Sequence, residues 1–232
     1  MEIVIRRLIE GARQADGLTV VIDVFRAYSL ECWLYAMGAK CIRPVGAVEE
    51  ALAWREKDPG CVLIGERHGR QLAGFDFGNS PSTVRPEAVR DRLVIHTTSA
   101  GTQGAANAAQ AEEILAGSFV NAKATAAYIR RKNPAKVSLV CMGKEGLEPA
   151  EEDELCALYL KSLLEGSGMP DIRERLDALR TGGGSHFFRA DLQDVFPRAD
   201  FGMCTDLDRF GFVIRICRDG EGLISLKEEL PE

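Results

Sequence analysis

The sequence lacks the features that would place the protein in a membrane or in a disulfide-stabilised class. No apolar run approaches the ~20 residues that a helix needs to cross a bilayer. Residues 1–7 do not show the charged-then-apolar order of a signal peptide. The seven cysteines are widely spaced and include no C-x-x-C pair, so neither a zinc cage nor a disulfide framework is indicated. We therefore expect a cytoplasmic protein with no membrane partner.

The sequence also lacks the basic stripe of a nucleic-acid binder. Its formal net charge is −6, and the charge is spread along the chain. No nucleic-acid partner is therefore expected, whereas a small anion held by a few local arginines is compatible with the sequence. An apolar content of 46% and a charged content of 28% are ordinary for a globular protein. The length fits a single domain, residues 1–232, in which a bilobal shape and assembly into a homodimer are left open.

Short apolar runs alternate with longer helical patterns in the first two thirds of the chain. The strand-like runs are residues 20–22, 41–45, 62–64, 93–96 and 137–141. The helical patterns between them are residues 30–37, 48–56, 104–115 and 122–132. Strands that are apolar on both faces and separated by helices predict a layered α/β/α fold with a mixed, largely parallel sheet.

The remainder of the chain is more irregular. Residues 151–164 begin acidic and turn apolar, which suits a helix with favourable charge at its N-terminus. Residues 170–180 predict another amphipathic helix, and three consecutive glycines, 182–184, follow it. Residues 212–216 predict a late strand.

The run 18–29 is the most informative stretch, because Asp23 follows a buried strand and Arg26 lies three residues later. One interpretation makes Asp23 a helix cap with Arg26 as its ion-pair partner. The other makes Asp23 a metal ligand or phosphoryl acceptor, and Arg26 an anion clamp. The Ser29 hydroxyl in the next turn is a candidate to bind substrate.

A second acid and guanidinium, Glu66 and Arg67, follow another predicted strand. Most isolated pairs of this kind are surface pairs of little energetic consequence. The carboxyl ends of parallel strands, however, share one edge of a sheet, where ligands usually bind. We therefore expect both clusters to lie at one site.

Two loops rich in turn formers carry further polar groups. Residues 74–81 contain Asn79 and Ser80, which can close around an anion, and Asp76, which is either a turn residue or a metal ligand. Residues 97–104 join a strand to a helix and favour either helix capping or a phosphate or sulfonate site. The candidate substrate-binding residues in this second loop are Thr97, Thr98, Ser99, Gly101 and Thr102.

Three further positions complete the candidates. Glu152 and Asp153 belong to an acidic run that is either a solvated helix face or part of a Mg²⁺ site. His186 follows the three glycines and is either a bystander or a general acid that protonates a leaving alkoxide. His96 lies in an apolar strand, which favours a buried core residue.

In this order, the clusters resemble the 2-phosphosulfolactate phosphatase family of coenzyme M biosynthesis. The resemblance runs through residues 20–27, 65–67, 74–81, 97–102, 117–122, 141–143 and 152–154, and more weakly through 206–210. It implies a Mg²⁺-dependent phosphatase with its own α/β fold, outside the haloacid dehalogenase group. Phe25 stands where that group's D-x-D motif would need its second aspartate. The resemblance implies a Ser/Thr-rich continuation after residue 27, and Tyr28 and residues 30–32 depart from it.

The resemblance implies hydrolysis of 2-phospho-3-sulfolactate to 3-sulfolactate and phosphate. The implied catalytic residues are Asp23, Arg26, Arg67 and His186, and the candidate Mg²⁺ ligands are Asp23, Glu66, Asp76, Glu152 and Asp153. Asp23 is either a ligand or a nucleophile, and the ligand role is favoured. The alternatives are a phosphatase for another 2-phospho-carboxylate, such as phospholactate or phosphoglycolate, and a non-catalytic protein that binds a small anion.

Overall fold

The computed structural model describes residues 1–230 and confirms an α/β fold built on a large, mixed and mostly parallel sheet. The order of the strands in this sheet is β1-β8-β2-β7-β9-β10-β3-β6-β4-β5. The strands are β1 (Glu2–Arg7), β2 (Gly17–Ile22), β3 (Cys41–Pro44), β4 (Val62–Arg67), β5 (Arg70–Gln71), β6 (Leu93–Thr97), β7 (Ala111–Gly117), β8 (Lys136–Cys141), β9 (Phe212–Asp219) and β10 (Gly222–Glu229).

Helices connect most of the strands. They are α1 (Leu8–Arg13), α2 (Ala27–Ala36), α3 (Val48–Lys57), α4 (Pro86–Val89), α5 (Gly101–Asn107), α6 (Ala122–Lys132), α7 (Glu151–Glu165), α8 (Ile172–Ala178) and α9 (Arg198–Cys204). Short 3₁₀ helices form η1 (Phe119–Asn121), η2 (Ser185–Phe188) and η3 (Ala190–Leu192). In the part of the chain that the structure covers, no helix is long and apolar enough to span a membrane.

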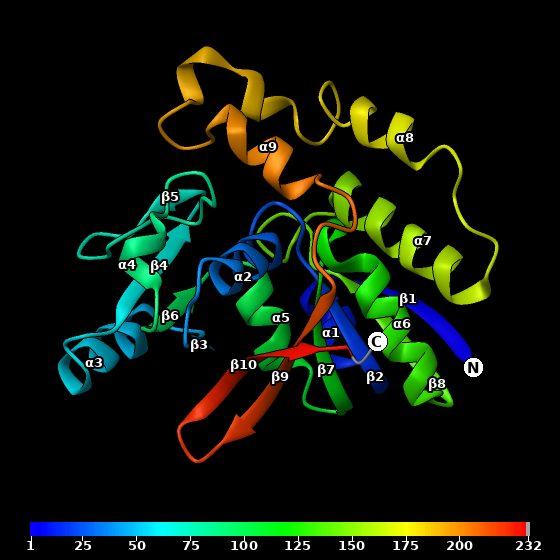
Figure 1. Cartoon of the computed structure of the whole chain (residues 1–232), viewed down its shortest axis with the longest axis horizontal. Coiled ribbons are helices and arrows are strands. Elements are labelled where there is room, and N and C mark those ends of the chain that lie inside the picture. Colours follow the sequence, from blue (N-terminus) through cyan, green and yellow to red (C-terminus); the bar gives the residue numbers. More distant parts are fainter. Residues whose placement is uncertain (231–232) are drawn as a thin grey trace.

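Two groups of parallel strands form two wings. β1, β8, β2 and β7 pair in parallel in one wing, and β3, β6 and β4 do so in the other. The antiparallel hairpin β9–β10 joins them, because β9 pairs with β7 and β10 pairs with β3. Figure 1 shows the wings on the right and left with the hairpin below them. The chain crosses between the wings twice, through α2 after β2 and through α5 after β6.

Apolar side chains bury both faces of the central strands. Along β2, Val21 packs into a core shared by the two wings, where Ile64 of β4 also lies. Its neighbours Val20 and Ile22 point the other way, into a core formed with α6 and α7. Because the sheet is covered on both sides, the ends of its strands are held rigidly and can position polar groups.

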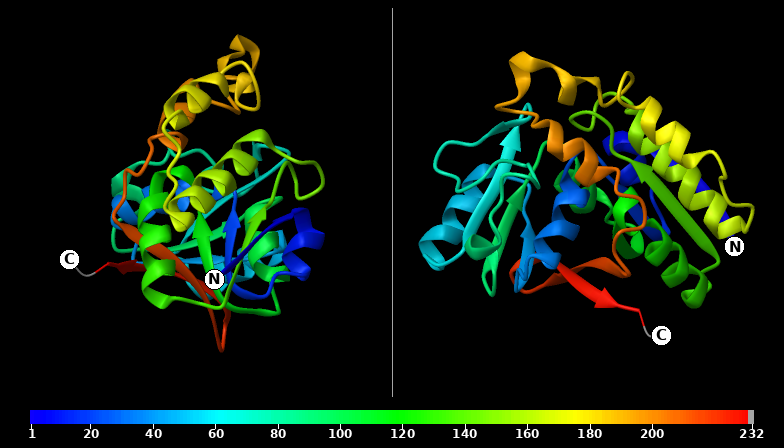
Figure 2. Two further views of the ribbon diagram at one scale, coloured as in Figure 1. Left: turned by 90° about the vertical axis from the view of Figure 1, so that its right-hand side faces the viewer. Right: turned by 45° about the horizontal axis from the view of Figure 1, so that its top comes forward.

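The segment 172–204, which we call the arch, runs over the upper edge of the sheet from the end of α7 toward β5 (Figures 1 and 2). Aromatic contacts fasten it to the body of the molecule. The ring of Phe25, which follows β2, lies 5.0 Å from that of Phe187 and 5.8 Å from that of Phe201, between centroids. Phe187 and Phe201 are both buried. The arch is therefore packed against the loop that carries Asp23 and Arg26.

Most predicted elements are confirmed, and one is wrong. The helices expected at residues 122–132 and 151–164 are α6 and α7, and the late strand at 212–216 lies within β9. The helix expected at 104–115 ends at Asn107, and β7 begins at Ala111. β7 lies between β2 and β9, and pairing on both edges outweighs the helix propensity of its alanine and glutamate residues. The strands β1 and β10 were not predicted from the sequence.

Candidate active site

The carboxyl ends of four strands meet at a cavity of about 560 Å³. Its walls come from the segments that follow β2, β4, β6 and β8, from the start of α7 and from the arch. Asp23 and Glu66 both line it, as the shared edge of a parallel sheet leads one to expect. The two crossings between the wings, at the starts of α2 and α5, also lie here.

Acidic side chains outnumber basic ones in this cavity. The acids that line it are Asp23, Glu66, Glu145, Glu151, Glu152 and Asp153, and the cations are Arg26 and Lys144. Four of the acids, at positions 23, 66, 152 and 153, are buried. Buried like charges repel one another strongly, because little solvent screens them.

Backbone N–H groups satisfy two of these buried acids. Asp153 accepts hydrogen bonds from the N–H of Val24 at 2.9 Å and of Gly143 at 2.8 Å, one on each carboxylate oxygen. Glu66 accepts the N–H of Gly69 and of Ser99, each at 2.7 Å and again on separate oxygens. These two carboxylates therefore join neighbouring loops across the cavity floor.

The other two, Asp23 and Glu152, are less well satisfied. Asp23 Oδ1 accepts the N–H of Ala27, the first residue of α2, at 3.1 Å. Within residues 1–230, no other residue donates a hydrogen bond to the Glu152 carboxylate. Burial raises the pKa of Asp23 to about 6, with repulsion from Glu66 adding to it. Burial likewise raises the pKa of Glu152 to about 7, with a contribution from the charge of Asp23.

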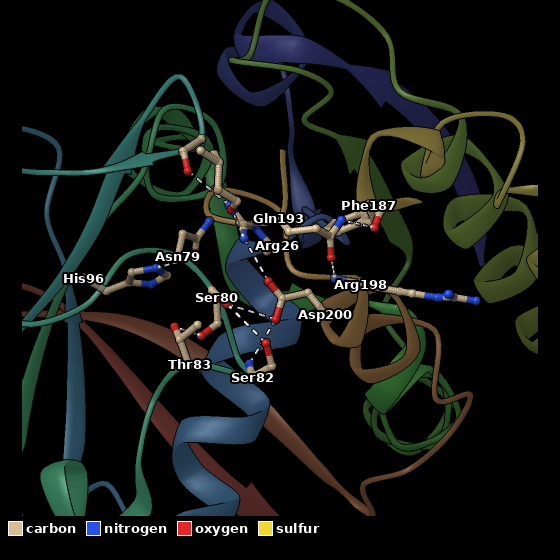
Figure 3. Close-up of polar contacts among 12 residues, drawn as sticks. Arg26, Asn79, Ser80, Ser82, Thr83, His96, Phe187, Gln193, Arg198 and Asp200 are labelled. Atoms are coloured by element: carbon tan, nitrogen blue, oxygen red, sulfur yellow. Dashed lines mark hydrogen bonds and ion pairs between the residues drawn. The ribbon is translucent and has the colours of Figure 1, made fainter. Parts of the chain in front are cut away.

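The capping interpretation of the sequence made Arg26 the ion-pair partner of Asp23. In the structure, Arg26 pairs with other groups. Its Nη1 donates to Asp200 Oδ2 at 2.8 Å and to the carbonyl of Val195 at 2.9 Å, and its Nη2 donates to the carbonyl of Gly69 at 3.2 Å (Figure 3). The side chains of Arg26 and Asp200 are 3% and 0% exposed. The guanidinium thus holds the arch to the loop after β4 and also supplies positive charge to the cavity wall.

Asp200 continues this network beyond Arg26. Its Oδ1 accepts the Ser80 hydroxyl at 3.0 Å and the N–H of Ser82 at 2.9 Å (Figure 3). Ser80 lines a smaller neighbouring cavity of about 390 Å³ and not the main one. Asn79 lines both cavities.

His186 lines the main cavity from the arch. Burial lowers its pKa to about 4, and the nearby positive charge of Arg26 lowers it further. The imidazole is therefore neutral at pH 7, so it can accept a proton but does not hold one to donate as a charged general acid. The general-acid role expected from the sequence is thereby disfavoured.

Three other candidates lie outside the cavity. The Arg67 guanidinium donates to the carbonyls of Glu66 and Gly46 and to Thr97 Oγ1, so it braces the loop. The Ser29 hydroxyl donates to the carbonyl of Val24 at 2.8 Å inside the helix start. Asp76 accepts the N–H of Leu63 and pairs with Arg55, which supports the turn interpretation and not metal binding.

The loop 97–102 is occupied by the protein's own groups. Thr98 and Thr102 bond to each other's backbone and side-chain atoms at the start of α5, which is the capping alternative. Thr97, Thr98 and Thr102 are buried, and none of them lines the cavity. The N–H of Ser99 is taken by Glu66, and Gly101 abuts the Asp23 carboxylate. The predicted anion site at this loop is therefore filled by carboxylates of the chain itself.

Sequence reasoning missed Asp200, Lys144 and Phe196, whose ring lines the cavity and lies 4.8 Å from the guanidinium carbon of Arg26. Asp200 lies in a seven-residue helix with no motif around it, and only the folded arch brings it to Arg26. Lys144 follows the Cys141-Met142-Gly143 run, and the position of that run after a predicted strand is a signal that could have identified it. His96 is buried, as its place in an apolar strand predicted.

Comparison with known proteins points to one family. The family model described as 2-phosphosulpholactate phosphatase matches residues 3–182. A probable 2-phosphosulfolactate phosphatase of Bacillus subtilis is 30% identical over 206 residues, which are 88% of this chain and 89% of that protein. Proteins with the same description from Caldicellulosiruptor saccharolyticus and Deinococcus radiodurans are 40% and 37% identical, over 68% and 72% of this chain and 66% and 71% of theirs. The matched segment 3–182 contains Asp23, Glu66 and Glu152, whereas His186 and Asp200 lie beyond it.

Replacing Asp200 by Asn should destabilise the protein. The substitution keeps the shape of the side chain but leaves the buried Arg26 charge without its partner, so we expect a loss of about 3 kcal/mol in the free energy of unfolding. Urea unfolding at pH 7 measures it. Asp191→Asn is the matched control, because Asp191 pairs with Arg189 on the surface and should contribute less than about 1 kcal/mol. Equal losses in the two variants would contradict the role of the buried pair.

Replacing Glu152 by Gln should have the opposite effect. The folded-state pKa of about 7 lies above the ordinary value of 4.5, so the stabilisation linked to this group is present below pH 4.5 and is lost as the pH rises through 7. In metal-free buffer, Glu152→Gln should therefore match the wild type near pH 4.5 and exceed it at pH 8, by at most about 3 kcal/mol. Thermal and urea unfolding at both pH values measure this. Glu165→Gln, on an exposed side chain at the end of α7, should show no such gain.

Proposed function

The chain belongs to the 2-phosphosulpholactate phosphatase family, and we propose that it hydrolyses the phosphate ester of 2-phospho-3-sulfolactate in a reaction that needs Mg²⁺. The products are 3-sulfolactate and inorganic phosphate. The cavity at the carboxyl ends of β2, β4, β6 and β8 is the proposed site of this reaction.

The observation that carries the Mg²⁺ requirement is the excess of acid in the cavity. Six carboxylates face two cations there, and one of those cations, Arg26, is already paired with Asp200. A substrate with phosphate, sulfonate and carboxylate groups would be repelled by such a site. A divalent cation placed between the protein's carboxylates and the anionic groups of the substrate would convert this repulsion into attraction.

The available oxygen atoms suit Mg²⁺. This ion prefers oxygen ligands and is commonly bound by one or two carboxylates together with waters and substrate phosphate. Asp23 accepts the N–H of Ala27 and faces Gly101 at the start of α5, and within residues 1–230 no other residue donates to the Glu152 carboxylate, whereas both oxygens of Asp153 accept N–H groups of other residues. Within the described residues, no three His, Cys, Asp or Glu side chains are grouped as a metal site. When bound, Mg²⁺ would draw charge from the phosphoryl oxygens and favour ionisation of a coordinated water.

The chain's own residues complete the reaction. Arg26 places positive charge at the cavity wall, and the exposed Lys144 can reach an anionic group of the substrate. His186, neutral at pH 7, can accept a proton from the attacking water at a ring nitrogen. We assign Asp23 to metal binding and not to nucleophilic attack, because its carboxylate is wedged between the starts of α2 and α5.

Phosphate release from 2-phospho-3-sulfolactate tests this function directly. We expect turnover that requires Mg²⁺, stops with a chelator and falls by about 10²–10³-fold in kcat/KM in Asp23→Asn. Asp76→Asn is the matched control, since Asp76 lies outside the cavity and should keep activity near the wild-type level.

A panel with phospholactate and phosphoglycolate decides the substrate. Preference for either of these would assign the site to a different 2-phospho-carboxylate. Absence of Mg²⁺-stimulated release from every member of the panel would refute the phosphatase and leave a protein that only binds small anions.

A further inference from the structure

A pair of ionisable side chains lies in the core beneath the cavity wall. Glu31 of α2 and His96 of β6 are both 0% exposed, and the His96 Nδ1 lies 2.9 Å from Glu31 Oε1. Neither residue lines the main cavity. Burying two ionisable side chains rarely stabilises a fold more than apolar residues of the same size would. The pair therefore calls for an explanation other than stability.

The third member of this network reaches the cavity. Asn79, which follows β5 along the chain, has its Oδ1 3.2 Å from His96 Nε2 (Figure 3). The Asn79 side chain is 5% exposed and lies at the junction of the main cavity and the cavity of about 390 Å³, where Arg26 also lines both. A chain of contacts thus runs from Glu31 through His96 to a side chain that faces the site.

The hydrogen-bonding capacity of each group sets the direction of this chain. The Glu31 carboxylate only accepts, so His96 Nδ1 donates to it. The structure places the Asn79 carbonyl oxygen against His96 Nε2, and because an amide oxygen only accepts, Nε2 donates in this arrangement. The Asn79 Nδ2 is left with two N–H donors, and among residues 1–230 no group accepts from it. Because the oxygen is held inward by His96, the amide nitrogen is the atom offered to the cavity.

We propose that Glu31 and His96 are positioning residues that fix the Asn79 amide with its N–H groups toward an anionic oxygen of the substrate on the Arg26 side of the cavity. The inference rests on the proposed function and adds a specificity element to it. A neutral N–H donor can bind an anionic oxygen of the substrate. An added cationic side chain would instead form an ion pair with one of the carboxylates in the cavity.

A double-mutant cycle on ligand binding tests the proposal. The probes are inorganic phosphate and 3-sulfolactate, each titrated calorimetrically into the Mg²⁺-loaded protein, with KM and kcat measured in parallel. Asn79→Asp, which replaces the donor by a carboxylate of the same shape, should weaken binding of at least one probe and raise KM by about 10- to 100-fold. His96→Gln should weaken the same probe by about 10-fold, with a smaller change in kcat.

The decisive comparison is made in a second background. Once Asn79→Ala has removed the amide, His96→Gln should cause no further loss of affinity, because its effect passes through Asn79. Equal losses in the two backgrounds, or wild-type affinity in Asn79→Asp, would overturn the proposal. Thr125→Val serves as the control for a change in the core, since Thr125 is buried on α6 away from the cavity and should bind both probes normally.

A measurement on the wild-type protein covers the case in which His96→Gln does not fold. Nitrogen-15 NMR of the His96 ring should show protons on both nitrogens, and the Asn79 side-chain amide signals should shift when a probe is added. An Nε2 without a proton would overturn the proposal, since the amide would then point its oxygen at the cavity. These readouts do not need turnover, so an inactive wild type that binds the probes would refute the phosphatase without refuting the role of Glu31 and His96.

Discussion

Burial of negative charge at the carboxyl edge of the sheet is the constraint on which the rest of this structure depends. Asp23, Glu66, Glu152 and Asp153 come from three distant parts of the sequence, and the folded chain holds all four within one cavity wall. Backbone N–H groups compensate Glu66 and Asp153, and in doing so they tie the loops around the site together. Asp23 and Glu152 accept fewer hydrogen bonds from other residues, and burial raises the pKa of both carboxyl groups. The protein therefore maintains at this edge a repulsion that a divalent cation would relieve, which is the arrangement expected where function and stability compete.

Two buried pairs of polar side chains, Arg26–Asp200 and Glu31–His96, flank the acidic edge and have different roles. Arg26 and Asp200 connect the arch to the loops after β2 and β4, so the ceiling of the cavity and its positive charge depend on the same contact. Glu31 and His96 lie beneath the opposite wall and connect, through Asn79, to the cavity. The Arg26–Asp200 pair is desolvated, so removing either partner leaves a buried charge without its counterion. The site is thus built into the core and not added to a loop on its surface.

Local patterns in the sequence predicted most of the elements, though not β1 or β10, and the edge at which the polar residues gather. The strands that lead to Asp23 and Glu66 were predicted from their apolar runs, each of which is followed by a carboxylate. The helices α6 and α7 were predicted from their periodicity and charge. β7 was assigned to a helix because its alanines and glutamates favour one, and only the pairing with β2 and β9 reverses that preference. The same limit applies to the residues at the site. Whether Thr98, Ser99 or Arg67 faces a ligand or another part of the chain depends on contacts with residues far away in the sequence. Asp200, which holds Arg26 from 174 residues away, carries no local signal at all.

The central claim is that Asp23 and Glu152 together hold the divalent cation that allows an acidic cavity to accept an anionic substrate. The most direct measurement is a crystal structure of the wild-type protein with Mn²⁺ and 3-sulfolactate, in which anomalous scattering locates the metal. The account predicts a Mn²⁺ peak in direct contact with the carboxylates of Asp23 and Glu152, and sulfolactate lying between that peak and the Asn79 amide. A metal bound away from both carboxylates, or sulfolactate bound in a different cavity, would contradict it.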